Sequence, residues 1–157
     1  MQLVFAGSCT ADSRRLIEER AAVLGISDAV HITGYLDDEG YRDWLRRAWC
    51  AVQLRTIDFG ESTGTVHDAM ATGVPVITNV ASCRDLPNGT VVNIDLAVDE
   101  LVNRLEAVLF DSLTAAELVR RARVHAESWT FAHVARQLQA VIDDVIPASS
   151  KSFILSR

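Results

Sequence analysis

The residues of this sequence best suited to bind a ligand lie between positions 55 and 68. Gly60 and Gly64 allow the backbone to approach a ligand closely. Ser62 and Thr63 stand just before a predicted helix, whose N-terminus presents N–H groups and the positive end of a dipole. Arg55 follows a predicted strand, and its forked guanidinium suits phosphate oxygens. Together these residues predict a diphosphate site.

Plainer interpretations of the same segment stay open at this point. Ser62 or Thr63 is equally suited to cap the helix. Asp68 can serve as a favourable partner of the helix dipole, and Glu61 as a solvated loop charge. We expect His67 to be a lone surface histidine, because it falls on a different helical face from Asp68.

Metal and nucleophile chemistry find little support elsewhere in the sequence. His31, His125 and His133 have no cysteine or carboxylate at metal-ligand spacing, so no metal is expected. Gly7 and Cys9 belong to a strand-turn-helix segment that lacks the Walker and dinucleotide fingerprints. The cysteines are odd in number and widely scattered. They predict small buried thiols in a reducing cytoplasm: Cys9, Cys50 and Cys83.

Alternating strands and helices must position these residues. Apolar runs predict strands at 3–6, 29–33, 50–54, 76–77 and 91–94, and the first of them should be buried. Helical patterns cover 12–24, 64–72, 98–110, 114–126 and 131–145. A further helix follows the second strand and is capped by Asp37 or Asp38. This order predicts an α/β fold, a Rossmann-like parallel sheet flanked by helices, over 1–147. Residues 148–157 are expected to form a loose tail with an apolar cluster, Phe153-Ile154-Leu155.

Ligands of such sheets bind where strands end and loops turn into helices. Four loops meet this condition: Gly7–Thr10, Gly34 with Tyr35 and Leu36, Arg55–Gly64, and Asn79–Asp85. The third carries the phosphate-binding residue types described above.

Composition limits the partners. The 157 residues carry a net charge of −6 with 6% aromatic residues, which argues against nucleic-acid binding. No apolar run approaches the roughly 20 residues of a membrane span. With no basic leader after Met1, the composition favours a cytoplasmic protein and gives no sign of membrane contact.

The central segment resembles the C-terminal, donor-binding domain of retaining glycosyltransferases of group 1 (family 4), which consist of two Rossmann-like domains. That family shows E-G-F-G followed by E-A-M-A-x-G-x-P-V-I, and this chain has GESTGTVHDAMATGVPVI. LVFAG, VHITGYL and HAESWTFAHVARQL are similar to its flanking segments. The resemblance covers about residues 3–145.

Two departures from the family pattern matter. The two family glutamates stand eight residues apart, whereas the position eight before Asp68 is Gly60 and the acid comes one later, at Glu61. Asp68 itself replaces the second glutamate. The family also has a leading strand and a Lys-Gly motif before the first strand seen here. The resemblance therefore implies a fragment, inactive by itself, in which the edges of the first and fourth strands lack a partner.

The resemblance implies a sugar transferred with retention from a UDP-sugar or GDP-sugar, without a metal, in polysaccharide or glycoconjugate biosynthesis. Arg55 and the N–H groups of Ser62, Thr63 and Gly64 would hold the diphosphate. Asp68 would bind the ribose, Glu61 or Gly60 would lie near the sugar, and the Gly34-Tyr35-Leu36 turn near the base.

Two other functions remain. The chain could be a non-catalytic nucleotide-sugar-binding module that pairs with a separate acceptor-half subunit. It could also be a fragment of a sugar-nucleotide epimerase, which ranks lower because the central motif fits transferases better. The open sheet seam makes a homo-oligomer a further expectation.

Overall fold

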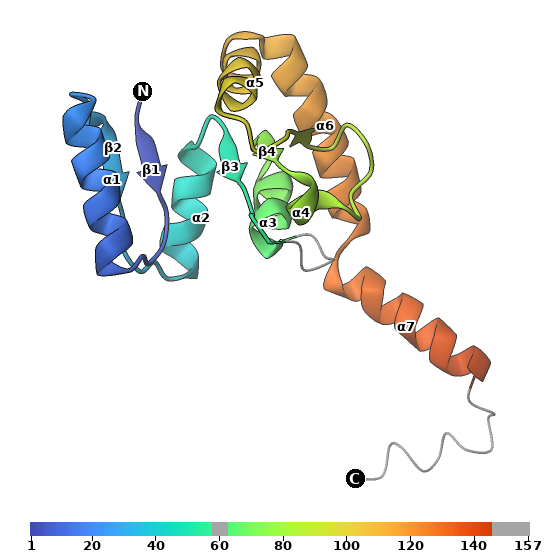
Figure 1. Ribbon diagram of the computed structural model, residues 1–157. Helices are drawn as coiled ribbons and strands as arrows, with labels where there is room; N and C mark the ends of the chain where they lie inside the picture. The colour runs from blue at the N-terminus through green and yellow to red at the C-terminus, as the bar shows by residue number, and fades with distance from the viewer. Residues whose placement is uncertain (58–62, 146–157) are drawn as a thin grey trace.

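The computed structural model describes residues 1–57 and 63–145, and its elements follow the predicted order (Figure 1). The strands are β1 (Leu3–Phe5), β2 (Val30–Ile32), β3 (Ala51–Gln53), β4 (Val76–Thr78) and β5 (Val92–Asn93). The helices are α1 (Ala11–Val23), α2 (Asp38–Arg47), α3 (Gly64–Thr72), α4 (Val80–Cys83), α5 (Val98–Phe110), α6 (Ser112–Ser128) and α7 (Phe131–Val145). A short 3-10 turn, Ser27–Ala29, precedes β2, and the sequence analysis had not predicted either this turn or α4.

Local capping explains where the central helices begin and end. The Asp37 carboxylate accepts the Gly40 N–H at 2.8 Å, so Asp37 and not Asp38 caps α2. Helix α3 ends at Gly73, whose φ of 81° lies in the left-handed region that glycine adopts without strain. Val74 then donates its N–H back to the Ala69 carbonyl at 2.9 Å, which completes a Schellman turn into β4.

The strands form two parallel sheets. In one, β1 pairs with β2, with Val4 opposite His31. In the other the order is β3-β4-β5, with Val52 opposite Ile77. The arrows of β1 and β3 point the same way in Figure 1, so their C-terminal ends lie at one edge of the molecule. The structure confirms the α/β class, with parallel strands flanked by helices.

The arrangement of the strands corrects two expectations. The fourth strand, β4, is paired on both sides, so the described strands with an edge that lacks a partner are β1, β2, β3 and β5. The first strand is also not buried, since the side chains of Leu3 and Phe5 are 53% and 39% exposed. The first result follows from the place of β4 between β3 and β5, and the second from the split between the sheets, which leaves β1 with one neighbouring strand, β2.

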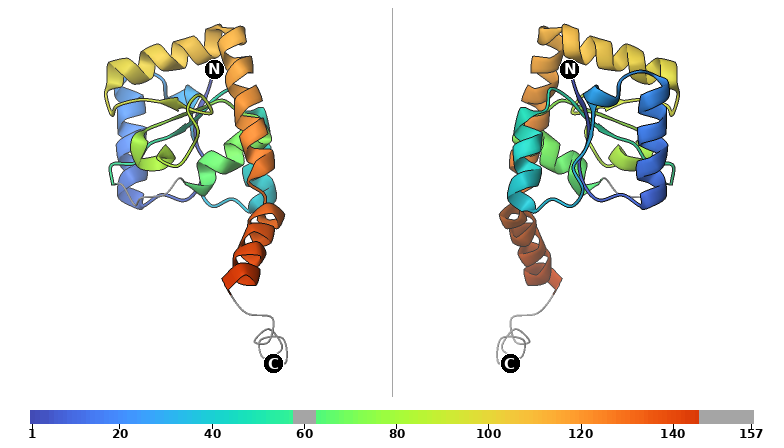
Figure 2. Two further views of the ribbon diagram at one scale, coloured as in Figure 1. Left: turned by 90° about the vertical axis from the view of Figure 1, so that its right-hand side faces the viewer. Right: turned by 90° about the vertical axis from the view of Figure 1, so that its left-hand side faces the viewer.

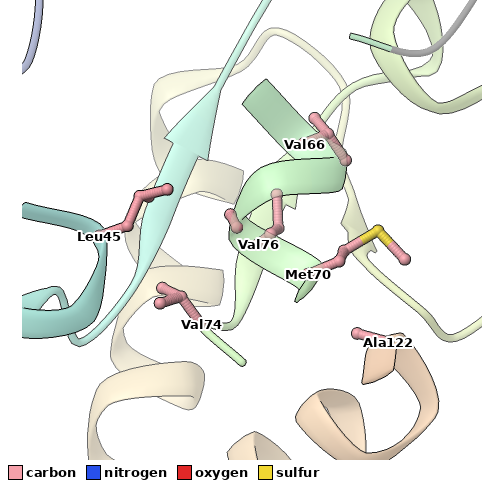
Figure 3. Close-up of a cluster of buried hydrophobic side chains, with 7 residues drawn as sticks. Leu45, Val66, Met70, Val74, Val76 and Ala122 are labelled. Carbon is pink, nitrogen blue, oxygen red and sulfur yellow. The ribbon is translucent and has the colours of Figure 1, made fainter. Parts of the chain in front are cut away.

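The main hydrophobic core lies around α3. Its fully buried members include Met70 and Val66 of α3 and Val76 of β4, and the cluster also contains Leu45 of α2 and Ala122 of α6. Figure 3 shows the Met70 side chain extending toward Ala122. Burying a side chain of this size stabilises a fold by about 1.5–3 kcal/mol, so α3 is the best-anchored helix of the site region.

A second, smaller core fixes the other face of the three-stranded sheet. Ile77 of β4 is fully buried and packs with Ile94 and with Val108 of α5. Leu101 and Leu105 of the same helix close over this cluster. The sheet β3-β4-β5 is therefore covered by α3 on one face and α5 on the other.

Helix α7 extends away from the rest of the domain (Figures 1 and 2). It has no buried residue, and Phe131 at its start is 97% exposed. Its large apolar residues recur every three or four positions, at Phe131, Val134, Leu138, Val141 and Val145. This spacing gives the helix an apolar stripe. No helix within 1–57 and 63–145 is long and apolar enough to cross a membrane.

Candidate functional site

Arg55 lies just beyond the C-terminal end of β3, where the sequence analysis expected a phosphate-binding residue, and this arginine is half-buried. Its backbone is held on both sides by one side chain. Asn79 Oδ1 accepts the Arg55 N–H at 2.9 Å, and Asn79 Nδ2 donates to the Arg55 carbonyl at 2.7 Å. The guanidinium therefore starts from a fixed backbone position at the edge where the strands end.

Thr63 and Gly64 form the N-terminus of α3. Thr63 is the N-cap, because its hydroxyl accepts the Val66 N–H at 3.2 Å, and it is 3% exposed. Its own N–H donates to the Ser82 carbonyl at 3.3 Å. The capping interpretation of Thr63 is confirmed, and its N–H already has an acceptor inside the protein. Gly64 opens the helix on the exposed side, where its N–H joins the positive end of the dipole.

Gly7 and Gly34 meet at the same edge, beyond the ends of β1 and β2. They form an isolated antiparallel bridge, and the Gly7 N–H donates to the Thr33 hydroxyl at 3.0 Å. Both have positive φ, 122° and 72°, which explains why glycine stands at these positions. Tyr35, next in the chain, is 83% exposed. The structure thus brings two of the four predicted loops together and offers an aromatic face to solvent beside them.

Asp68 lies farther along α3, on the side that faces α2. It lines a groove of about 570 Å³ between the two helices together with Tyr41, Arg42 and Arg46. Burial raises the pKa of Tyr41, and the Asp68 carboxylate raises it further, while the neighbouring Thr65 side chain opposes them. Asp68 is exposed, so its carboxylate is open to a ligand hydroxyl.

His67 is not the lone surface histidine that the sequence suggested. It is half-buried against α6, with its ring centroid 6.3 Å from that of His125 and 6.4 Å from that of Trp129. Burial lowers the pKa of His125 below its ordinary 6.5, His67 lowers it further, and Asp85 opposes them. The expectation failed because the second ring lies on a helix far along the chain.

The cysteine prediction was correct for two of the three residues. Cys83 is buried and Cys50 is half-buried, but Cys9, in the loop between β1 and α1, is exposed. All three are free thiols. Burial raises the pKa of Cys50 to about 11, although the backbone of Ile77 opposes this rise as a hydrogen-bond donor. A nucleophilic role therefore gains no support for Cys50.

Several predicted residues fall outside the described part of the chain. These are Gly60, Glu61 and Ser62 of the phosphate loop, and the tail from residue 148 with its Phe153-Ile154-Leu155 cluster. Within 1–57 and 63–145, no three side chains of the metal-ligating types gather into a group.

Asn79 and Ser82 belong to the fourth predicted loop, Asn79–Asp85, but the sequence analysis gave neither of them a role in the site. Asn79, which precedes α4 as its N-cap residue, is 5% exposed, and Ser82, within α4, is fully buried. An asparagine directly after a buried strand and before a helix is a capping signal that could have drawn attention to it. Its link to Arg55, 24 residues earlier in the chain, leaves no trace in the local sequence.

The described groups give this edge a defined chemistry. An arginine with a fixed backbone and the N-terminus of a nine-residue helix lie at the C-terminal ends of parallel strands. A guanidinium and an oriented helix terminus both stabilise anionic oxygens. The geometry suits a ligand that carries phosphate groups.

Comparison with known proteins identifies the family. A sequence model described as "Glycosyl transferases group 1" matches residues 1–111. No curated protein sequence matches the chain. Solved structures resemble it along most of its length, at identities that show the fold alone.

Three solved structures illustrate the likeness. Alr3699/HepE from Anabaena, in complex with UDP, has a TM-score of 0.79 at 14% identity, and the match covers 92% of this chain and 41% of that one. Sucrose-phosphate synthase from Thermosynechococcus elongatus gives 0.74 at 20% identity, covering 92% and 38%. The C-terminal domain of the group 1 glycosyltransferase LpcC from Francisella tularensis gives 0.66 at 15% identity, covering 76% and 63%.

This chain spans about two fifths of the length of the HepE structure. The LpcC structure that this chain resembles is that of a C-terminal domain alone. Because the family model matches more than two thirds of the sequence, the chain belongs to the group 1 glycosyltransferases, and its fold is Rossmann-like.

Proposed function

We propose that this chain is the donor-binding domain of a retaining glycosyltransferase and binds the diphosphate of a UDP-sugar or GDP-sugar. The observation that carries the proposal is Arg55 at the end of β3, beside the N-terminus of α3. The leaving diphosphate gains negative charge as the sugar departs, so donors held in place at this edge would stabilise the transition state. HepE supports the proposal, since its structures hold UDP and UDP-glucose.

The remaining residues take roles within this proposal. Arg55 and the Gly64 N–H face the phosphates, with Ser62 beside them. The Thr63 N–H is bound to Ser82, so Thr63 acts by ordering the helix start. Asp68 accepts hydrogen bonds from the ribose hydroxyls.

The other assigned positions surround the donor. Glu61 or Gly60 lies near the sugar, and Gly34, Tyr35 and Leu36 near the base, with Gly7 supporting their turn through its bridge to Gly34. Cationic side chains and the helix terminus replace a divalent metal in this scheme. The free thiols fit a reducing compartment, so we place the reaction in the cytoplasm, in polysaccharide or glycoconjugate synthesis.

A calorimetric titration of the purified chain with UDP, GDP and ADP tests donor binding. We expect saturable binding of one nucleotide. Arg55→Ala should weaken it by about 1.5–3 kcal/mol, the range for hydrogen bonds to charged groups, or roughly 10- to 150-fold in Kd. Arg104→Ala is the matched control. It removes the same charge from an exposed position on α5, where Arg104 pairs with Glu100. Equal affinities of the Arg55→Ala and Arg104→Ala variants would remove Arg55 from the site.

A second candidate, a donor-binding module that pairs with a separate acceptor-half subunit, is favoured by the exposed apolar surfaces. The stripe on α7 and the edge strands β1 and β3 are uncovered within the described residues. Exposed stripes and strand edges of this kind favour association, either with such a subunit or between copies of the chain. Sugar transfer by the isolated chain would contradict this candidate, whereas transfer only after an acceptor half is added would support it.

A further inference from the structure

Asn79 holds the backbone of Arg55 through both of its side-chain groups. Its Oδ1 accepts the Arg55 N–H at 2.9 Å, and its Nδ2 donates to the Arg55 carbonyl at 2.7 Å. An amide side chain that meets one donor and one acceptor in this way has a single favourable orientation. Asn79 is 5% exposed, so water competes little for either bond.

These two bonds continue the sheet beyond its last backbone pair. The ladder between β3 and β4 ends with Gln53 opposite Thr78, and the residue that follows β4 is Asn79. The Asn79 carbonyl accepts the Ser82 N–H at 2.8 Å as the chain turns into α4. The side chain of Asn79 thus replaces the missing ladder bonds and fixes Arg55 after β3 has ended.

Fixing the backbone of an arginine matters most if its guanidinium must meet a ligand. An arginine loses considerable rotamer freedom on binding, and a backbone that is already ordered lowers the remaining cost. The ends of the two strands are already tied together at their last backbone pair, where the Thr78 hydroxyl donates to the Gln53 carbonyl at 2.6 Å. The Asn79 bonds order Arg55 in addition to this link.

We propose that Asn79 is a positioning residue that orders Arg55 for the diphosphate of the donor. This inference rests on the proposed function. Asn79 acts through Arg55 and has no contact of its own with the ligand. Its effect on affinity must therefore vanish once the Arg55 guanidinium is absent.

A double-mutant cycle tests this dependence. UDP, GDP and ADP are titrated against the wild type, Asn79→Ala, Arg55→Ala and the double variant. We expect Asn79→Ala to weaken binding of the nucleotide by about tenfold, within the usual range of coupled neighbours. The double variant should bind no more weakly than Arg55→Ala alone. If Asn79→Ala does not fold, Asn79→Asp, which keeps the acceptor for the Arg55 N–H, takes its place in the cycle.

Thr78→Val is the matched control for a merely structural effect. It removes a buried hydrogen bond between the same two strands, one residue away, and leaves the Asn79 side chain in place. We expect it to lower the unfolding temperature as Asn79→Ala does while nucleotide affinity stays within about twofold of the wild type.

The outcomes separate the two proposals. Wild-type affinity in a folded Asn79→Ala variant, or losses that add in the double variant, would overturn the inference and leave donor binding intact. An equal loss of affinity in Thr78→Val would also overturn it, because the effect would then be general destabilisation. A folded wild-type chain that binds none of the three nucleotides would refute the proposed function and the inference together.

Discussion

Replacing Gly73 by alanine tests how the central helix is connected to the sheet. Gly73 ends α3 with a φ of 81°, and its N–H donates to the Met70 carbonyl at 3.1 Å. Two effects oppose an added Cβ at this position. One is the left-handed backbone conformation itself. The other is the Arg123 guanidinium, because the new carbon would lie 2.7 Å from its Cζ.

We expect the left-handed backbone conformation to account for most of the loss in stability. A left-handed residue with a side chain costs about 1–2 kcal/mol. Arg123 is exposed, so the end of its flexible side chain can move away at little cost. We therefore expect Gly73→Ala to lower the free energy of unfolding by about 1–2 kcal/mol, which corresponds to about 2–8 °C in Tm for a domain of this size.

Gly25 provides a matched control within the chain. It also has a left-handed φ, 68°, but an added Cβ would meet nothing within 4 Å. Denaturant and thermal unfolding of Gly73→Ala, Gly25→Ala and Gly73→Ala in an Arg123→Ala background separate the two effects. We expect each of the three glycine substitutions to lower the free energy of unfolding by a similar amount. A much larger loss in Gly73→Ala that Arg123→Ala rescues would refute our reasoning, since the collision would then outweigh the backbone strain.

Two further predictions concern titratable groups. Because burial and His67 lower the pKa of His125 below 6.5 and Asp85 only opposes them, the unfolded chain binds a proton that the folded chain resists. Stability should therefore fall as the pH drops through 6.5, and His125→Gln should flatten this dependence in thermal unfolding. A pH dependence unchanged by the substitution would contradict the assignment. Cys9 is exposed, whereas burial raises the pKa of Cys50 to about 11 and also raises that of Cys83, followed by a smaller contribution from Asp85. A thiol reagent at pH 8 should modify one thiol rapidly, and Cys9→Ser should abolish that fast phase; a fast phase that survives would place the reactive thiol elsewhere.

The position of most elements was predictable from the sequence. Helix α3 spans Gly64–Thr72 as predicted, and α5 and α7 also begin and end at the predicted residues. These boundaries depend on neighbouring residues along the chain: a threonine cap, a glycine that adopts a left-handed conformation, and apolar residues at helical spacing. Such signals act within a few residues, so they can be recognised without knowledge of the fold.

The phosphate-binding residue types were also readable from the sequence, because Arg55 and Gly64 flank a loop between a strand and a helix. The distant contacts that hold such residues in place were not readable from the sequence. The bonds between Asn79 and Arg55 join residues 24 apart, and the ring contact between His67 and His125 joins two different helices. The partition of the strands into two sheets was likewise missed, together with the pairing of β4 on both sides. Sequence patterns thus determined which segments fold and which residues could bind an anion. Only the tertiary structure decided which distant side chains hold those residues in place, because strand order and helix packing depend on contacts that leave no local signal.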